Sequence, residues 1–454
     1  MNDTIASIAT SLGVGAISII RVSGKDSISI VNKLFKGHDL EKVESHTIHY
    51  GHIINNSEII DEVLVSIMRS PKTYTMEDVV EINCHGGIAT TNKVLELLLL
   101  NGARIAEPGE FTKRAFLNGR IDLIEAEAVS DLINSETELE RKVAINGVNG
   151  NLSKLIKSLR KELLDIISNI EVNIDYPEYV DIYEVTLEDI KIKIPKIKQE
   201  LKRIIEDYEN SRLLYEGIKV AIIGRPNVGK SSLLNKLLDN EKAIVTNIPG
   251  TTRDLVEGTT ILDGIKIHLI DTAGIRETDD VVEKIGVEKS LKAIDDANLI
   301  LMVLNNNEEL TNEDIELINK CNKTTIFVIN KNDLETKLKL DNKIKNINKD
   351  YIISINTIDN KGIEKLKTKI KELYKIDKIN NSDFTYITNL RQITKIKESY
   401  NILLSVEEGI NNNIELDMLE MDLKEIWNVL GEITGDSYDE ELLDDLFKNF
   451  CVGK

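Results

Sequence analysis

The sequence predicts a multidomain protein with an α+β domain at the N-terminus, followed by an all-α domain into which an α/β domain is inserted. The length of 454 residues suits about three domains at ~150 residues each. The apolar pattern also changes twice, from short strand-like segments to a helical period, and from there to strands alternating with helices. The predicted ranges are 1–118 for the α+β domain, 119–215 and 377–454 for the two parts of the helical domain, and 216–376 for the inserted domain.

The N-terminal range contains short β-rich segments separated by turns. Ala16–Val22, Ile59–Met68 and Val79–Asn83 are rich in Ile and Val and are predicted to form strands. Val94–Leu100 is predicted to be helical and to end at the Asn-Gly pair that follows it. These elements indicate an α+β domain.

Two amphipathic stripes flank the inserted domain. The first ends before Pro177, which cannot continue a helix. The second is spaced by three and four residues along one helix face. Each stripe needs a partner, so both flanks are expected to pack into one helical domain. The stripe residues are Leu152, Leu155, Ile156, Leu159, Leu163, Ile166, Ile167, Ile170 and Ile174, and then Leu416, Leu419, Leu423, Ile426 and Leu430.

The middle of the chain alternates apolar strands with helices, which is typical of a doubly wound, mainly parallel sheet. The predicted strand segments read KVAIIG, KIHLID, LILMVL, TIFVIN and YIISI.

Composition restricts the class of protein. The net charge of −20 excludes a general nucleic-acid coat, because Lys and Arg dominate phosphate binding. Cys84, Cys321 and Cys451 have no metal-like spacing, and a sparse odd set suits a reducing compartment. No signal-peptide pattern and no apolar run of ~18 residues is present, so a cytoplasmic protein without a membrane segment is expected.

A phosphate-binding loop follows the first strand of the inserted domain. Gly224–Ser231 fits the pattern G-x-x-x-x-G-K-[ST], in which glycines let backbone N–H groups surround phosphates. Lys230 is expected to contact the β- and γ-phosphates, and Ser231 to bind Mg²⁺. The alternative is a chance Gly-rich turn between a strand and a helix.

Two further segments complete a γ-phosphate and magnesium site. Asp271–Gly274 (DTAG) follows a strand, so that Asp271 can hold the Mg²⁺ shell and the Gly274 N–H can face the γ-phosphate. Thr252 lies between the two motifs and is the predicted second hydroxyl ligand of Mg²⁺. By itself the Thr-Thr pair could also be a helix cap.

Guanine recognition is predicted at Asn330–Asp333 (NKND). A carboxylate at Asp333 can accept hydrogen bonds from both N1–H and the exocyclic amine of guanine, which adenine does not offer. The inserted domain is therefore predicted to be a Ras-like α/β P-loop GTPase domain. The predicted GTP-binding residues are Asn227, Val228, Gly229, Lys230, Ser231, Ser232, Thr246, Asn247, Ile248, Pro249, Gly250, Thr251, Thr252, Asp271, Thr272, Ala273, Gly274, Asn330, Lys331 and Asp333.

The motifs resemble, over essentially the whole chain, those of the MnmE (TrmE) family of tRNA-modification GTPases. The most specific are Glu107–Asp122 (EPGEFTKRAFLNGRID) and the terminal Cys451–Lys454 (CVGK), which ordinary small GTPases lack. The others are GRPNVGKSS, PGTTRD, DTAGIR and CHGG.

The resemblance implies a homodimer that acts with the flavoprotein MnmG, which is expected to make most of the tRNA contact. Together they would add an aminomethyl or carboxymethylaminomethyl group to carbon 5 of the wobble uridine of certain tRNAs. A tetrahydrofolate derivative (5-formyl- or 5,10-methylene-tetrahydrofolate) would supply the one-carbon unit. The N-terminal domain would bind this folate and dimerise, and the matching positions for folate contacts are Arg21, Glu81, Arg120 and Lys454.

The resemblance also implies how GTP is cleaved. Ile275 occupies the position where Ras-like GTPases carry a water-positioning Gln, and no arginine finger is evident. In the family a potassium ion takes the place of the finger, and its positions here are Asn227, Thr246, Ile248 and Thr251. Glu283 would orient the water, giving Glu283, Asn227 and Lys230 as the catalytic set. Glu283 could alternatively be a solvated helix residue, and Cys451 either a catalytic or a packing thiol.

Two other functions fit the nucleotide motifs. A ribosome-assembly GTPase of the Era or Der type shares them but needs a basic RNA-binding module, and a regulatory switch would bind GTP without turnover.

Overall fold

The computed structural model describes residues 3–175, 180–238, 258–271, 294–321, 323–339, 349–374, 387, 389–412, 414–438, 440–448, 450 and 453. Within it the chain forms two compact units. One unit comprises residues 1–134, 144–203 and 389–454, and the other comprises residues 135–143 and 204–388. No helix within the described ranges is both long and apolar enough to cross a membrane.

The N-terminal part of the first unit is a seven-stranded sheet in the order β3-β4-β5-β6-β2-β1-β7. All of its pairs are antiparallel except β1 with β7. Helices α1 and α2 pack on one face, where alternate strand residues such as Ile20, Val65 and Ile82 are fully buried. The elements are β1 (Ile5–Ile8), β2 (Ile17–Ser23), α1 (Ser27–Leu34), β3 (Phe35–Lys36), β4 (Thr47–Asn55), β5 (Glu58–Met68), β6 (Val79–His85), α2 (Ile88–Leu100), β7 (Arg104–Ile105) and α3 (Glu110–Leu117).

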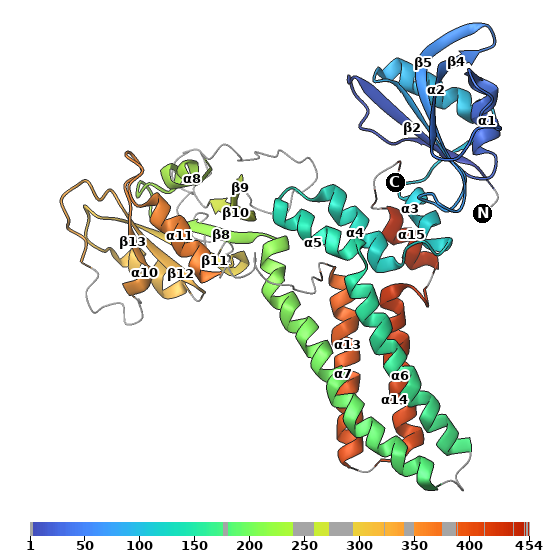
Figure 1. The fold of residues 1–454 in the computed structure, drawn as a ribbon. Helices are drawn as coiled ribbons and strands as arrows, with labels where there is room; N and C mark the ends of the chain where they lie inside the picture. The colour runs from blue at the N-terminus through green and yellow to red at the C-terminus, as the bar shows by residue number, and fades with distance from the viewer. Residues whose placement is uncertain are drawn as a thin grey trace. The chain divides into compact units, whose positions relative to one another are not determined.

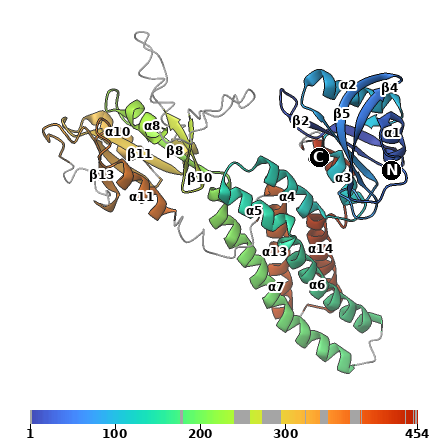
Figure 2. The same ribbon diagram turned by 45° about the horizontal axis from the view of Figure 1, so that its top comes forward.

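In the helical part of the first unit, α6 (Asn151–Asp175), α13 (Leu390–Asn411), α14 (Leu416–Thr434) and the first part of α7 (Val180–Tyr215) lie side by side (Figures 1 and 2). The predicted stripe of α14 is buried throughout, and that of α6 is buried except at Leu155 and Ile174. Ile174 is exposed because it lies at the end of its helix. The other helices are α4 (Leu123–Asn134), α5 (Glu138–Val148) and α15 (Glu440–Lys448). Glu138–Val143 of α5 and Ile204–Tyr215 of α7 belong to the second unit.

A buried ion pair joins the two sequence halves of the helical part. The Arg391 Nε and Nη2 atoms of α13 donate to the two carboxylate oxygens of Glu127 on α4, at 2.9 and 3.0 Å. Arg391 also donates to the carbonyl oxygens of Glu432 and Ile433 at the end of α14. One guanidinium therefore fastens three helices, two of them from the far end of the chain.

The second unit contains a six-stranded sheet in the order β13-β12-β11-β8-β10-β9. It is parallel except for the edge strand β9, which forms a hairpin with β10. Apolar residues of α8 and α11 cover one face, and Ile318 of α10 packs on the other. The elements are β8 (Ile218–Ile223), α8 (Lys230–Leu238), β9 (Gly258–Leu262), β10 (Ile265–Asp271), β11 (Leu299–Asn305), α10 (Asn312–Lys320), β12 (Thr325–Asn330), β13 (Ile352–Ser354) and α11 (Ile363–Leu373).

Candidate functional site

The predicted phosphate loop connects the end of β8 to the start of α8. Three of its residues have positive φ: Gly224 at 148°, Asn227 at 62° and Gly229 at 100°. A Cβ atom on Gly229 would lie 2.1 Å from the Asn330 Nδ2 atom, so only glycine fits there. The loop thus turns tightly into a helix N-terminus, an arrangement that presents N–H groups to an anion.

Lys230 holds the loop together from the first turn of α8. Its side chain is buried, and Nζ donates to the carbonyl oxygens of Gly224 and Arg225, both at 2.8 Å. The ammonium group therefore lies within the curve of the loop, where an anion would meet both the cation and the helix N-terminus.

The sheet brings the predicted motifs to one edge. Strand β8 pairs in parallel with β10 and β11, and β11 pairs in parallel with β12. Asp271, the last residue of β10, is in register with Ile222, just before the phosphate loop. Asn330, the last residue of β12, is in register with Asn305 at the end of β11. The carboxyl ends of these strands therefore lie at the same edge of the sheet. Ligands of parallel α/β sheets bind at that edge.

Asn330 connects the predicted guanine-recognition turn to the phosphate loop. Its Nδ2 atom donates to the Val228 carbonyl oxygen at 2.9 Å, and the side chain is 1% exposed. Its Oδ1 atom is buried and has no hydrogen-bond partner within the described ranges. Lys331 follows with a φ of 60°, and Asp333 lies exposed beyond it. The turn is thus fixed at Asn330 and open to solvent at Asp333.

Two residues that support this edge, Asn306 and Arg225, were not predicted from the sequence. Asn306 donates from its backbone N–H to the Asn330 carbonyl oxygen at 2.9 Å, and from Nδ2 to Thr336 Oγ1 at 3.1 Å. Arg225 of the loop donates from Nε to Asp314 at 2.9 Å. Asn306 could have been found, because two asparagines directly follow the apolar strand β11 at its carboxyl end.

The segment after β13 also contacts the recognition turn. The Asn332 N–H donates to the Ile355 carbonyl oxygen at 3.3 Å, and the Ile355 N–H donates to the Ile329 carbonyl oxygen at 2.7 Å. The Ile355 side chain is apolar and buried, so the contacts with the turn are made by its backbone.

Several predicted site residues lie outside the described part of the chain, as does the side chain of Asp271. Their assignments therefore stay predictions. These residues are Thr246, Asn247, Ile248, Pro249, Gly250, Thr251, Thr252, Thr272, Ala273, Gly274, Glu283, Cys451 and Lys454.

The N-terminal sheet carries a second cluster, around Tyr74. Arg21 on β2 and Glu81 on β6 are in register, and the Arg21 Nε atom donates to Glu81 at 2.9 Å. The Arg21 guanidinium also lies 5.9 Å from the Tyr74 ring centroid and 5.7 Å from that of Phe111. Arg120 lies over Tyr74 at 4.8 Å and donates to its carbonyl oxygen at 3.0 Å. Two of the four predicted folate residues, Arg21 and Arg120, thus lie against the Tyr74 ring, and Glu81 pairs with Arg21.

Tyr74 is fixed by a buried charged network below it. Its hydroxyl group lies 2.9 Å from Thr112 Oγ1 on α3. On the same helix Arg114, only 1% exposed, donates to Glu77 at 3.1 Å and to Glu110 at 3.0 Å. Burial alone would lower the pKa of Arg114, but these two carboxylates outweigh burial and raise that pKa. The guanidinium therefore stays charged and holds the Tyr74 loop against α3.

The end of the chain reaches this cluster. Arg21 Nη1 donates to the Gly453 carbonyl oxygen at 3.1 Å. Gly453 is buried with a φ of 94°, and a Cβ atom there would lie 2.5 Å from the Ile8 carbonyl oxygen. Glycine is therefore the residue type that fits at position 453, directly before Lys454.

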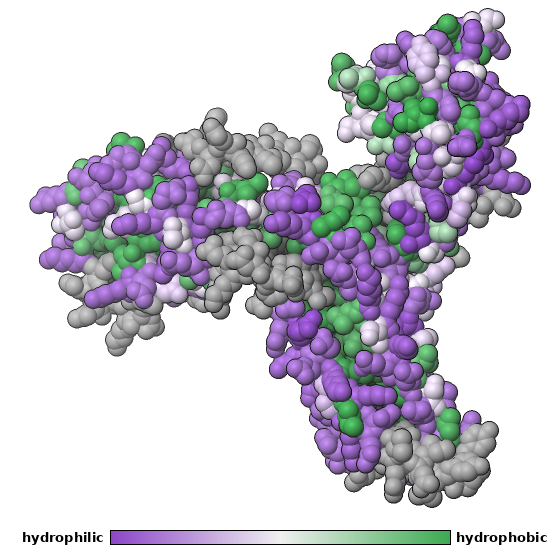
Figure 3. Space-filling model, viewed as in Figure 1, coloured by the Kyte–Doolittle hydropathy of each residue, from purple (hydrophilic) through white to green (hydrophobic). Residues whose placement is uncertain are grey.

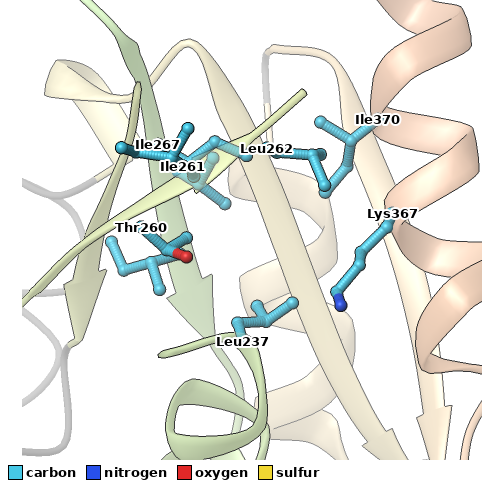
Figure 4. A pocket seen from close by; sticks show the side chains of 9 residues that line it. Leu237, Thr260, Ile261, Leu262, Ile267, Lys367 and Ile370 are labelled. Carbon is cyan, nitrogen blue, oxygen red and sulfur yellow. The ribbon is translucent and has the colours of Figure 1, made fainter. Parts of the chain in front are cut away.

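A separate small apolar pocket lies between the β9–β10 hairpin, α8 and α11 (Figure 4). Its lining includes Leu237, Thr260, Leu262 and Ile370, with the Lys367 amine at one side. Of the predicted nucleotide-binding residues that the structure describes, none lines this pocket.

Comparisons with known proteins cover the full chain. A family model described as "GTP-binding protein TrmE N-terminus" matches residues 4–120, and one described as "MnmE helical domain" matches residues 123–451. The "tRNA modification GTPase MnmE" of Ligilactobacillus salivarius is 51% identical over 100% of this chain and 98% of its own length. The protein of the same description from Bacillus cytotoxicus is 50% identical over 100% and 99%.

Among solved structures, the G domain of the FeoB iron transporter of T. maritima is 30% identical. That match covers 35% of this chain and 98% of the FeoB chain, with a TM-score of 0.25. The full-length matches and the two family models confirm the predicted fold class. The chain belongs to the MnmE (TrmE) family of tRNA modification GTPases.

Proposed function

We propose that this GTPase hydrolyses GTP in a potassium-dependent reaction and uses it to drive modification of carbon 5 of the wobble uridine of certain tRNAs. The observation that carries the nucleotide site is the hydrogen bond from Asn330 to Val228, which ties the guanine-recognition turn to the phosphate loop. A nucleotide spanning that edge would place its base near Asp333 and its phosphates at Lys230. The unpartnered Asn330 Oδ1 atom adds an acceptor beside it.

The residues at the loop fit the two ions that the family implies. Ser231 is exposed in the first turn of α8, where its hydroxyl can join the Mg²⁺ shell with Thr252. Asn227 is exposed with a positive φ, so its amide oxygen is available at the mouth of the loop. With Thr246, Ile248 and Thr251 it would hold K⁺, whose charge stabilises negative charge developing between the phosphates. Lys230 orients the phosphates, and Glu283 would position the attacking water.

Rates in potassium and sodium test this assignment. We expect turnover to be at least about tenfold faster in K⁺ than in Na⁺ at equal ionic strength. Asn227→Ala should abolish the difference and retain most of the GTP affinity, whereas Asn235→Ala, an exposed asparagine on α8, should behave like the wild type. Equal wild-type rates in the two salts would contradict the potassium mechanism.

We also propose that the Tyr74 cluster binds a tetrahydrofolate derivative. Folate offers a glutamate tail that suits Arg21, Arg120 or Lys454, and a pterin edge that suits a carboxylate such as Glu81. The aromatic rings of Tyr74 and Phe111 offer surfaces on which the pterin can stack. The donor set therefore fits the reduced folates, 5-formyl- or 5,10-methylene-tetrahydrofolate.

Calorimetry with 5-formyltetrahydrofolate tests the cluster. Arg21→Ala combined with Glu81→Ala should abolish measurable binding, and deletion of Cys451–Lys454 should weaken it while GTP hydrolysis persists. Lys93→Ala removes an exposed ion pair on α2 of the same domain and should leave binding unchanged. Full binding by the double variant would place folate elsewhere.

The open face of the N-terminal sheet supports a homodimer. Ile17, Ile48, Tyr50 and Leu64 are between 46% and 65% exposed on β2, β4 and β5. Tyr50 and Leu64 are directly paired across the sheet, and apolar side chains gather on this domain in Figure 3. Contiguous exposed apolar residues mark interaction sites. Tyr50→Glu with Leu64→Glu should therefore yield a monomer by light scattering, whereas Glu58→Lys, at the end of β5, should stay dimeric.

The acidic net charge disfavours extensive tRNA binding by this chain, which supports a cytoplasmic complex in which the flavoprotein MnmG makes most of the tRNA contact. Mass spectrometry of tRNA nucleosides from a deletion strain should show loss of the carbon-5 group. Complementation by the wild type, but not by Lys230→Ala, would tie that loss to GTP hydrolysis.

A further inference from the structure

The β9–β10 hairpin lies between two predicted nucleotide-binding motifs in the sequence of the inserted domain. The segment before it carries the Thr251-Thr252 motif, and β10 itself ends at Asp271, the first residue of DTAG. Any shift of β10 along its own axis therefore coincides with a shift of Asp271. The contacts of its outward-facing side chains show which neighbouring segments such a shift would affect.

Lys266 on β10 is bound to the start of α5. Its Nζ atom lies 3.0 Å from Glu136 and 3.1 Å from Glu140, whose side chain is 4% exposed. Burial alone would lower the pKa of Lys266, but its pairing with both carboxylates outweighs burial and raises that pKa. The ammonium group is therefore charged and held by α5.

Glu140 uses its other oxygen to cap α5. Its Oε2 atom accepts from the backbone N–H groups of Glu136 at 2.7 Å and Thr137 at 3.3 Å, while the Glu140 N–H donates to Thr137 Oγ1 at 3.1 Å. These reciprocal bonds form a capping box, which fixes the first turn of a helix. One carboxylate thus joins the first turn of the helix to the strand.

Apolar packing reinforces the same contact. Leu139 of α5 is 7% exposed and belongs to the core of the inserted domain together with Leu262, Ile265 and Ile267 of the hairpin. Residues 135–143 accordingly form one compact unit with this domain, whereas α5 continues to Val148, in the other unit. The helix therefore passes from one unit into the other.

We propose that the Lys266–Glu140 ion pair transmits the nucleotide state of β10 to α5, and so from the GTPase domain into the helical domain. The proposal rests on the GTP site described above. Because Glu140 is also the cap of α5, a change in its contact with Lys266 alters the stability of the first turn of the helix. Nucleotide binding and the order of that turn are then coupled in both directions.

Hydrogen exchange of the full-length protein tests the link. Amide exchange in Leu139–Val143 should differ at least about fivefold between the GDP complex and the complex with a non-hydrolysable GTP analogue. In Lys266→Met this difference should vanish. Lys371→Met is the matched control, because Lys371 pairs with Asp263 in the turn of the same hairpin, and within the described part of the chain it forms no ion pair with α5.

Nucleotide affinity separates this idea from the GTP site itself. Both variants should still bind GTP, with the affinity of Lys266→Met changed by no more than the about fivefold coupling itself. Failure of the wild type to bind GTP would instead refute the nucleotide site. The coupling is overturned if wild-type exchange in α5 is the same in both complexes, or if Lys266→Met keeps the wild-type difference.

Discussion

At the scale of single residues, the proposed nucleotide site combines side chains with separate tasks. Asn330 is buried and binds the protein, whereas Asp333 three residues later is exposed. The buried amide fixes the turn, and the exposed carboxylate remains accessible to a base.

Asp333→Asn should exchange the base specificity. An amide cannot accept from both guanine donors, so affinity for GTP should fall about 100-fold, and affinity for xanthosine triphosphate should rise. Fluorescence titration with both nucleotides measures this, with Glu335→Gln, an exposed carboxylate in the same segment, as the control. Unchanged GTP affinity in Asp333→Asn would rule out the assignment.

The residues that the sequence predicted are those whose type and spacing follow from phosphate or guanine chemistry, such as Lys230 and Asp333. The supporting residues were harder to predict. Asn306 and Arg225 act through contacts with Asn330 and Asp314, which lie 24 and 89 positions away in sequence. Such pairings depend on strand order and register, which a single sequence does not reveal.

At the scale of elements, strand β10 combines a buried face with outward side chains that bind neighbouring segments. His268, two residues after Lys266, lies 3.1 Å from the Glu216 carbonyl oxygen through Nε2 and 3.1 Å from Thr259 through Nδ1. Burial lowers the pKa of His268 below its ordinary value of 6.5. The neutral ring thus binds the backbone at Glu216, in the short connection between α7 and β8.

This pKa shift predicts a pH dependence of stability. Because the folded-state pKa lies below the unfolded one, the unfolded chain binds the proton more readily, and stability is lost as pH falls below about 6.5. Urea unfolding of the wild type should therefore show a larger loss between pH 7.5 and pH 5.5 than that of His268→Asn. The same pH dependence in both proteins would mean that His268 is not the group responsible.

Helices were predicted better than strands at this scale. The stripes of α6 and α14 have a long, regular period, so that their buried faces followed from spacing alone. Strands β1, β3, β4, β7 and β9 were missed, and β4 and β9 show two reasons. Polar residues such as Thr47, His49 and His52 interrupt β4, and β9 is a five-residue edge strand. In both cases pairing with a neighbour, and not local composition, defines the strand.

At the scale of the whole molecule, the insertion of the α/β domain was predicted because the apolar stripes of α6 and α14, on either side of it, each required a packing partner. The assignment of residues 135–143 was not foreseen, since they read as helical sequence and yet form one unit with the GTPase domain. Leu139 and Glu140 acquire that role only through contacts with a hairpin more than a hundred residues later.

The Glu127–Arg391 pair should matter most for the first unit. Glu127→Ala would leave Arg391 partly buried without its carboxylate, which typically costs about 3 kcal/mol. Denaturant unfolding monitored at the single tryptophan, Trp427 on α14, measures this loss. GTP affinity should persist, because the nucleotide site belongs to the other unit.

Lys424→Met provides the control for that prediction. Lys424 pairs with Glu171 and Glu420 on the surface and is 48% exposed, so its removal should change stability little. If Glu127→Ala unfolded at the same denaturant concentration as Lys424→Met, the buried pair would not be what fastens the helical halves.

The separation of 264 positions between Glu127 and Arg391 imposes an order on biosynthesis. At about 5 to 20 residues per second, the ribosome needs about 15 to 50 seconds after making α4 before it supplies α13. Throughout that interval the apolar stripe of α6 and the Glu127 carboxylate emerge without the helices that cover them, while the whole GTPase domain is being made. The helical domain can therefore be completed only at the end of translation, so a nascent chain that stalls within the inserted domain exposes an unpaired apolar helix face to chaperones and proteases.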